Sequence, residues 1–335
     1  MGNPYYQGPT TDHFDGTRFF NPGHPSTDRS LADLLRWRMR GHKENWPDSV
    51  PVRQTRPQQR VGSLVVTMVG HASLLIQVAD LNITVDPVWS ERASPVRFAG
   101  PKRLTAPGIA FEDLPSIDTV LITHSHYDHL DASTLSRLWT RDRPRIIAAL
   151  GTDAIVTRTV PGTRPEAGDW GDTFALAPDV SVTLHSANHW SARSMRDRRM
   201  SLWCGFVLQA RGTVIYVAGD TGYGDGSIFR EVGERFGPPT LAILPLGAYE
   251  PRWFMRNQHV DPEEAVRIML GCGARQALGV HWGTFQLTDE ARLAPVTALA
   301  DACDRLGVLP ERFVAMEPGD VWPGSERLGA NAEDP

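Results

Sequence analysis

The sequence predicts an α/β fold, an αββα sandwich in which β-sheets pack against each other and helices cover their outer faces. Two observations lead to this prediction. Short apolar segments typical of strands begin near residue 63 and recur up to residue 280, and helical patterns are interspersed among them. The chain has 335 residues, 41% of them hydrophobic, which is enough to fill the core that such packing requires.

The first sixty residues are expected to form an N-terminal extension that packs on the main domain. They are rich in proline, glycine and charged residues and contain one helical pattern, at 30–40, for which Ser30 is a suitable N-cap. The apolar stripe of this helix consists of Leu31, Leu34, Leu35 and Trp37. We therefore divide the chain into an extension at 1–60, one domain at 61–325 and a C-terminal tail at 326–335.

The domain is expected to open with three strands joined by short connections, at 64–68, 73–78 and 81–85. Further strands are expected at 119–123, 145–149, 180–185, 203–209, 213–217, 241–246 and 276–280. Helices are expected from Asp131, which can cap a first turn, and at 227–236, 262–270 and 288–306. Asp261 can cap the helix that begins at Pro262, a residue favoured at the first helical position.

Charge and cysteine usage exclude several classes of protein. A net charge of −5 gives no general attraction to nucleic acid. The three cysteines, Cys204, Cys272 and Cys303, form no Cys-x-x-Cys pair, so neither a disulfide framework nor a structural zinc knuckle is indicated. The N-terminus lacks a secretory pattern, and no apolar run is long enough to span a bilayer. These features predict a cytoplasmic protein without a transmembrane segment.

His124, His126, Asp128 and His129 lie in one short run directly after the strand expected at 119–123. Packing does not need such a group, because uncompensated polar side chains are costly to bury. A pair of divalent metal ions does need it, and imidazole and carboxylate ligands without thiolate suit zinc with an open coordination position. The alternative interpretation is a solvated histidine-rich loop.

Three further residues follow expected strands in the same manner: His189, Asp220 and His281. A single histidine or aspartate at a strand end usually serves as a structural hydrogen-bonding group. Three of them beside the histidine-rich run favour metal binding instead. His185, within the strand expected at 180–185, competes with His189 for the same role and is otherwise a core histidine.

An apolar strand followed by a ligand residue, repeated along the chain, resembles the metallo-β-lactamase superfamily. Additional motifs are similar to those of its N-acylphosphatidylethanolamine-hydrolysing phospholipase D group and the bacterial homologues of that group. The motifs are Phe19-Phe-Asn-Pro22, Val69-Gly-His-Ala-Ser73, Val85-Asp-Pro87, Arg92-Ala-Ser-Pro95, Gly100-Pro-Lys-Arg103, Gly219-Asp-Thr-Gly-Tyr223, Gly247-Ala-Tyr-Glu-Pro-Arg-Trp-Phe-Met255, His259-Val-Asp-Pro-Glu-Glu-Ala265 and His281-Trp-Gly-Thr-Phe285. The resemblance covers most of the chain from about residue 60 onward. It implies two mixed β-sheets flanked by helices and a hydrolase domain at 61–325.

The resemblance also implies how the ligands are divided between two zinc ions. One ion would be held by His124, His126 and His189, the other by Asp128, His129 and His281, and Asp220 would bridge them. His189 is preferred over His185 because Ala187-Asn-His-Trp-Ser191 resembles the third motif of the family. Two such ions can activate a bridging hydroxide and stabilise charge on a phosphodiester. The implied reaction is phospholipase D-type hydrolysis of N-acylphosphatidylethanolamine-like lipids, with Asp128 and Asp220 among the catalytic residues.

Three residues outside this ligand set are candidates for supporting roles. Asp86 and His71 are expected to orient ligands from a second layer, against the alternatives of a turn aspartate and a structural histidine. His259 is the candidate for a catalytic group that does not bind metal and that stabilises the phosphate or protonates the leaving oxygen. Its place just before the helix at 262–270 is also compatible with a structural role.

Other functions remain open from the sequence. A lactonase or other ester hydrolase could use the same dinuclear site, because metal-activated hydroxide attacks carbonyl carbon as readily as phosphorus. A non-catalytic metal-binding protein is the alternative outside the enzymes. The expected partner is a small-molecule or lipid phosphodiester substrate, and binding to nucleic acid is not expected. Peripheral contact with a membrane and a homodimer are further expectations, since members of this family can dimerise.

Overall fold

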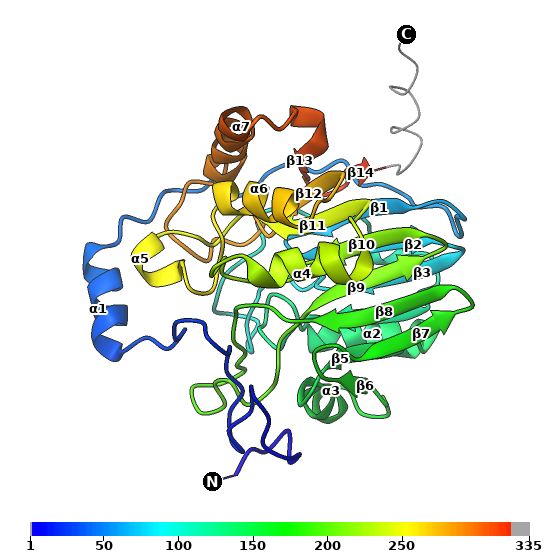
Figure 1. Ribbon diagram of the computed structural model, residues 1–335, viewed down its shortest axis with the longest axis horizontal. Coiled ribbons are helices and arrows are strands. Elements are labelled where there is room, and N and C mark those ends of the chain that lie inside the picture. The colour runs from blue at the N-terminus through cyan, green and yellow to red at the C-terminus, as the bar shows by residue number, and fades with distance from the viewer. Residues whose placement is uncertain (1, 323–335) are drawn as a thin grey trace.

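The computed structural model describes residues 2–322, and within that range the chain forms two seven-stranded sheets packed face to face (Figure 1). The first sheet has the order β14-β1-β2-β3-β4-β5-β6, and the second has the order β13-β12-β11-β10-β9-β8-β7. The strands of the first sheet are β1 (Val65–Gly70), β2 (Ser73–Val78), β3 (Leu81–Val85), β4 (Thr119–Ile122), β5 (Arg145–Ala149), β6 (Glu166–Gly168) and β14 (Val321–Trp322). Those of the second are β7 (Thr173–Ala177), β8 (Val180–His185), β9 (Gly205–Ala210), β10 (Thr213–Val217), β11 (Leu241–Pro245), β12 (Gln276–Val280) and β13 (Phe313–Ala315).

Both sheets are mixed. In the first, β14, β1, β2 and β3 pair antiparallel, and β3 to β6 pair parallel. In the second, β7 to β10 pair antiparallel, and β10 to β13 pair parallel. The predicted sandwich of two mixed sheets is therefore confirmed.

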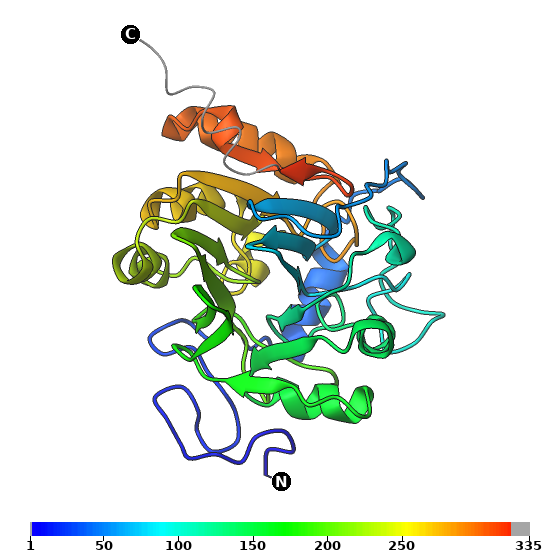
Figure 2. The same ribbon diagram turned by 90° about the vertical axis from the view of Figure 1, so that its right-hand side faces the viewer.

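The main hydrophobic core lies between the sheets, where buried side chains such as Leu74 and Ile83 of the first sheet meet Phe206 and Ile215 of the second. Helices cover both outer faces (Figure 2). The outer face of the first sheet carries α2 (Ala132–Asp142) and α3 (Thr152–Thr159), and the second carries α4 (Ser227–Phe236), α6 (Pro262–Gly271) and α7 (Ala294–Leu306). This arrangement leaves the ends of the central strands free to hold functional side chains.

The N-terminal residues contribute to the same body. Phe14 and Phe19 are fully buried in the core between the sheets. Helix α1 (Leu31–Arg40) lies beside the short helix α5 (Arg252–Met255), with Trp37 packed against Phe254 at a ring-centroid distance of 4.8 Å. The division at residue 60 stays a prediction, and the tail predicted at 326–335 lies outside the described residues.

The expected elements agree with the structure to within about two residues at most boundaries. Asp131 and Asp261 cap α2 and α6 as expected. The helix expected at 288–306 is an exception, because α7 begins only at Ala294. The carboxylate of Glu290 instead accepts hydrogen bonds from the backbone of Ala248 and Glu250, which holds the preceding segment in a loop. Across residues 2–322, no helix has the length and apolar character needed to cross a membrane.

Candidate metal centre

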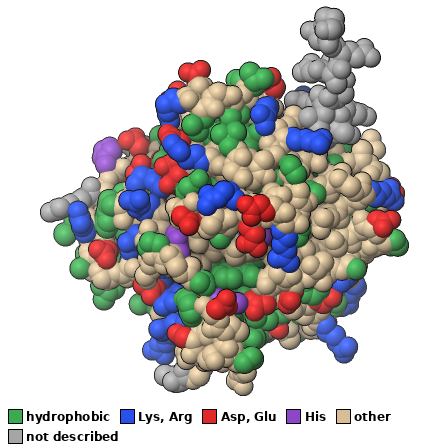
Figure 3. Space-filling model, viewed as in Figure 1, with side chains coloured by type: hydrophobic (Ala, Val, Ile, Leu, Met, Phe, Trp, Pro, Cys, Tyr) green, Lys and Arg blue, Asp and Glu red, His purple; other side chains and the backbone are tan. Residues whose placement is uncertain are grey.

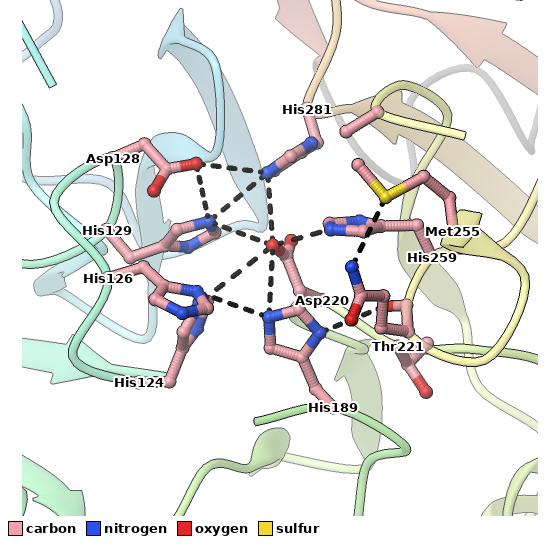
Figure 4. A network of polar contacts seen from close by, with 12 residues as sticks. His124, His126, Asp128, His129, His189, Asp220, Thr221, Met255, His259 and His281 are labelled. Carbon is pink, nitrogen blue, oxygen red and sulfur yellow. Dashed lines mark hydrogen bonds and ion pairs between the residues drawn. The ribbon is translucent and has the colours of Figure 1, made fainter. Parts of the chain in front are cut away.

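The candidate site lies at one edge of the sandwich, where the two sheets meet, because the topology brings several strand ends there. Strands β10, β11 and β12 run parallel, and β8 has the same direction as β10 because both pair antiparallel with β9. Their carboxyl ends therefore lie at the same edge. His189 follows β8, Asp220 follows β10, His281 follows β12, and the run at 124–129 follows β4 of the other sheet (Figure 4).

A first group of ring nitrogens comes from His124, His126 and His189. Nε2 of His124 lies 2.8 Å from Nδ1 of His126, and Nε2 of His189 lies 3.3 Å from that same nitrogen. The three ligand atoms lie within 4.8 Å of one another. Three nitrogens at this spacing can share one ion, and this is the trio that the family resemblance assigns to the first metal.

A second group contains Asp128, His129 and His281. Oδ2 of Asp128 lies 3.5 Å from Nε2 of His129 and 3.5 Å from Nε2 of His281. The two imidazole nitrogens are 3.2 Å apart. This is the trio that the resemblance assigns to the second metal.

Asp220 lies between the two groups. Its Oδ2 is 3.2 Å from Nε2 of both His129 and His281. On the other side the same oxygen is 3.9 Å from Nε2 of His124 and 3.7 Å from Nε2 of His189. Figure 4 shows this carboxylate at the centre of the ring of imidazoles. A carboxylate in this position can contact two metal ions at once.

Burial and neighbouring charges set the protonation of the candidate ligands. Burial lowers the pKa of His126 and of His189 to about 3, so both rings are neutral and have a free lone pair. Burial alone would raise the pKa of Asp220, but the charges of His129 and His281 hold it well below its usual range. His126 and His189 thus offer neutral imidazoles beside an ionised carboxylate.

The buried donor set fits divalent metal ions. Burial alone would lower the pKa of His129 and of His281, but Asp220 and other carboxylates raise that of His129 well above its ordinary value and that of His281 to about 9. Protons on these rings are replaceable by metal. Nε2 of His126 and Nδ1 of His259 are buried without a hydrogen-bond partner among the described residues. All donors are nitrogen or oxygen, as expected for catalytic zinc.

Asp86 orients one of the candidate ligands. Its Oδ2 lies 2.7 Å from Nδ1 of His129, and its carboxylate also accepts hydrogen bonds from the backbone N–H and the hydroxyl of Thr123. An ionised Asp86 can only accept, so Nδ1 of His129 carries a hydrogen, and Nε2 is the nitrogen whose proton a metal ion can replace. The structure thus places Asp86 beside a ligand candidate, as the sequence prediction expects.

His71 contacts the second group from the side of the first sheet. Its Nε2 lies 3.0 Å from Oδ2 of Asp128, and its backbone carbonyl accepts a hydrogen bond from the N–H of His281. It is buried, and burial together with the charge of His281 lowers its pKa to about 3. His71 therefore lies where it can position Asp128.

His259 lies at the rim of the cluster. Its Nδ1 is 4.0 Å from Oδ2 of Asp220, and its ring is 5.1 Å from that of His189. Burial lowers its pKa to about 3, with Asp220 acting in the opposite direction. This position is compatible with contact to a substrate bound at the metals, and His259 also forms a potential metal-binding group with His189 and Asp220.

His185 and His189 lie in different surroundings. His185 ends β8 and faces away, against Tyr216 and Phe236, and it belongs to none of the groups of ligand atoms. His189 faces the cluster, and its Nδ1 donates to the backbone carbonyl of Gln258 at 2.9 Å. A carbonyl only accepts, so Nε2 of His189 presents its lone pair to the first group.

Two contacts at the site were missed from the sequence. Trp190 packs against the ring of His126 in a T-shaped arrangement, with centroids 4.3 Å apart, and the guanidinium of Arg198 lies over the ring of Trp190 at 3.4 Å from its centroid. Gln258 acts through its backbone carbonyl, which carries no sequence signal. The contact of Trp190 could have been suspected from the sequence only because Trp190 directly follows the candidate ligand His189.

Comparisons with known proteins agree with this geometry. A family model described as "Beta-lactamase superfamily domain" matches residues 81–282, which is more than half of the chain. The chain belongs to the metallo-β-lactamase superfamily. A relative in Caenorhabditis elegans, N-acyl-phosphatidylethanolamine-hydrolyzing phospholipase D 1, is 36% identical over 280 residues, covering 79% of this chain and 77% of that protein. The resemblance inferred from the motifs is therefore confirmed.

A further relative and a solved structure are also similar to this chain. A metal-dependent hydrolase of Herpetosiphon aurantiacus is 28% identical over 268 residues, covering 78% of this chain and 98% of that protein. Isothiocyanate hydrolase from Delia radicum gut bacteria shares the fold, with a TM-score of 0.61, 20% identity and coverage of 77% of this chain and 98% of that one. As a member of this superfamily, the chain is a metal-dependent hydrolase.

Proposed function

We propose that this hydrolase is a zinc-dependent phosphodiesterase that cleaves N-acylphosphatidylethanolamine-like lipids in the manner of a phospholipase D. The observation that carries the proposal is the convergence of both ligand groups on Oδ2 of Asp220, which lies 3.2 to 3.9 Å from imidazole nitrogens of His124, His129, His189 and His281. The phosphodiester specificity is supported by 36% identity to the Caenorhabditis elegans enzyme over 79% of the chain.

In this proposal His124, His126 and His189 hold one ion, Asp128, His129 and His281 hold the other, and Asp220 contacts both. Bound divalent ions would polarise the phosphoryl oxygens and acidify a water at neutral pH. The chain contributes the orientation of the ligands. Asp86 and the carbonyl of Gln258 fix the hydrogen on Nδ1 of His129 and His189, so that each Nε2 lone pair faces inward.

The net reaction adds water across one ester bond. A water oxygen forms a bond to phosphorus, and the bond between phosphorus and the ethanolamine oxygen breaks. The leaving oxygen takes up a proton and departs as an N-acylethanolamine, while the other product is a phosphatidate. Nδ1 of His259, buried and without a hydrogen-bond partner among the described residues, lies at the rim where it can donate to the phosphate or to the leaving oxygen.

The direct test uses zinc-loaded protein, lipid in detergent micelles and water enriched in ¹⁸O. We expect N-acylethanolamine and phosphatidate as products, with the label in the phosphatidate, because water attacks phosphorus. Phosphatidylcholine, phosphatidylethanolamine and a lactone serve as competing substrates. Rapid lactone hydrolysis without phosphodiester cleavage would contradict the proposal, as would a label found in the released alcohol or in a fatty acid.

A further inference from the structure

Helix α1 turns its apolar side chains away from the protein. Leu31, Leu35 and Met39 have 76%, 58% and 78% of their surface exposed, and Leu34 has 44%. An amphipathic helix on a globular protein ordinarily turns its apolar stripe toward the core. The opposite orientation of α1 indicates that another apolar surface covers it.

The other side of α1 accounts for its contact with the protein. Trp37 packs against Phe254 and donates from Nε1 to Asp289 at 2.8 Å, and the guanidinium of Arg36 lies 4.7 Å from the ring centroid of Trp253. Leu31, Leu35 and Met39 follow one another at intervals of four residues, so they form one line along the helix. Polar and aromatic contacts thus fix the inner side and leave an apolar outer side.

Positive charge surrounds this apolar line. Residues 29–43 contain five Lys and Arg residues and one acidic residue, in a chain whose net charge is −5. Arg38 lies on the outer side between Leu34 and Leu31, and both Arg38 and Lys43 are exposed. Figure 3 shows hydrophobic and basic side chains together at the left edge, over α1. Apolar side chains between long cations suit the boundary of an anionic lipid bilayer, because the cations reach the headgroups.

We propose that α1 docks this protein on an anionic membrane surface, with Leu31, Leu35 and Met39 inserted at the level of the headgroups. The outer face is small for a protein interface. A helix of 10 residues is about 15 Å long, so its outward half presents roughly 250 Å², against about 800 Å² per partner in a stable dimer. A membrane needs only a few inserted side chains together with charge attraction.

The docking helix is connected to the metal centre by a short path. Arg29, just before α1, donates to the backbone carbonyl of Phe254, and the next residue, Met255, accepts a hydrogen bond from the N–H of His259. Figure 4 shows Met255 and His259 beside the cluster. The biological meaning of the docking rests on the proposed lipid substrate, since the helix would hold the site close to the surface that contains this substrate.

The test is flotation of the full-length protein with vesicles of phosphatidylcholine alone or of phosphatidylcholine and phosphatidylglycerol in equal parts. We expect binding to the anionic vesicles. The triple variant Leu31→Gln, Leu35→Gln, Met39→Gln should lose about 1,000-fold in partition coefficient, at roughly tenfold for each of the three apolar side chains. Arg38→Glu should weaken binding to anionic vesicles by roughly tenfold, and added salt should abolish this difference.

A matched control replaces three exposed leucines elsewhere, Leu270, Leu293 and Leu309, by glutamine, and it should bind like the wild type. The proposal is overturned if the wild type does not float with anionic vesicles, or if the α1 variant floats equally well. It is also overturned if sedimentation shows a dimer that the α1 variant dissociates, since the helix would then join two copies. Hydrolysis of micellar lipid is measured separately. Vesicle binding by a wild type without phosphodiesterase activity would contradict the proposed function and leave the docking intact.

Discussion

Oδ2 of Asp220 lies 3.2 Å from Nε2 of His129, and this contact joins the two halves of the candidate metal centre. His129 comes from the loop after β4 in the first sheet, and Asp220 comes from the end of β10 in the second. The site therefore exists only when the sandwich is assembled. Each sheet supplies ligand candidates to both groups, so an isolated half of the fold would leave both groups incomplete.

Asp220→Ala is expected to remove more metal and more activity than alanine in place of any single candidate histidine. The carboxylate faces both groups, and its loss leaves the charges of two ions less compensated. Metal content of the purified variant should fall below one ion per chain, with turnover reduced by several orders of magnitude. Asp301→Ala, which removes an exposed carboxylate on α7, is the control. Two tightly bound ions and normal turnover in Asp220→Ala would show that the bridging role is wrong.

Asp86→Asn tests the orientation of His129. The amide group would face Thr123 and Nδ1 of His129, which favours a ring whose hydrogen lies on Nε2 and whose lone pair points away from the metal. We expect zinc affinity to fall by roughly 10- to 100-fold, with activity largely restored by excess zinc. Asp80→Asn, at an exposed turn between β2 and β3, provides the control. Unchanged zinc affinity in Asp86→Asn would leave Asp86 as a purely structural turn residue.

Tyr5→Phe tests how the N-terminal residues pack on the domain. The hydroxyl of Tyr5 donates to Asp197 at 2.8 Å, and the same carboxylate accepts hydrogen bonds from the backbone of Arg193 and Ser194. The variant should lose about 1 kcal/mol in the free energy of unfolding near neutral pH. Urea unfolding measures this loss, and Tyr223→Phe is the comparison for removal of a hydroxyl elsewhere.

The same contact predicts a dependence on pH. Burial and the hydrogen bond to Asp197 raise the pKa of Tyr5 from 10.0 to about 12. A folded-state pKa above the unfolded value means that the stabilisation is complete below pH 10 and is lost as the pH rises through about 12. The stability difference between wild type and Tyr5→Phe should therefore shrink between these values. A constant difference across that range would contradict the prediction.

The sequence predicted the strand ends well because apolar strand segments and the polar residues that follow them are both local features. The run after β4 and the single residues after β8, β10 and β12 could each be recognised in this way. The partition of ligands between two ions depended on the family resemblance, since it depends on how two sheets meet. The direction in which the apolar stripe of α1 faces could not be predicted, because periodicity identifies a stripe without identifying what covers it. The predicted start of α7 was wrong because Glu290 accepts hydrogen bonds from backbone groups that are far away in the sequence.

His259→Ala separates chemistry from metal binding. We expect the variant to keep its metals and its melting temperature while turnover falls by roughly 10²- to 10⁴-fold. The buried ring is neutral near pH 7, with a pKa of about 3, but a bound phosphodiester brings a further negative charge that favours the protonated ring. Proton donation would then assist an alkoxide leaving group much more than a nitrophenolate, which needs no proton.

The measurement compares turnover of wild type, His259→Ala and His259→Gln on N-acylphosphatidylethanolamine and on bis(p-nitrophenyl) phosphate. If His259 protonates the leaving oxygen, both variants should lose far less activity on the nitrophenyl ester. Glutamine can donate a hydrogen bond but cannot transfer a proton, so it should be no better than alanine on the lipid. Equal losses on both substrates, with partial rescue by glutamine, would exclude proton donation and assign His259 to stabilising the phosphate. Loss of metal in both variants would instead make His259 a ligand, consistent with its 4.0 Å distance from Asp220.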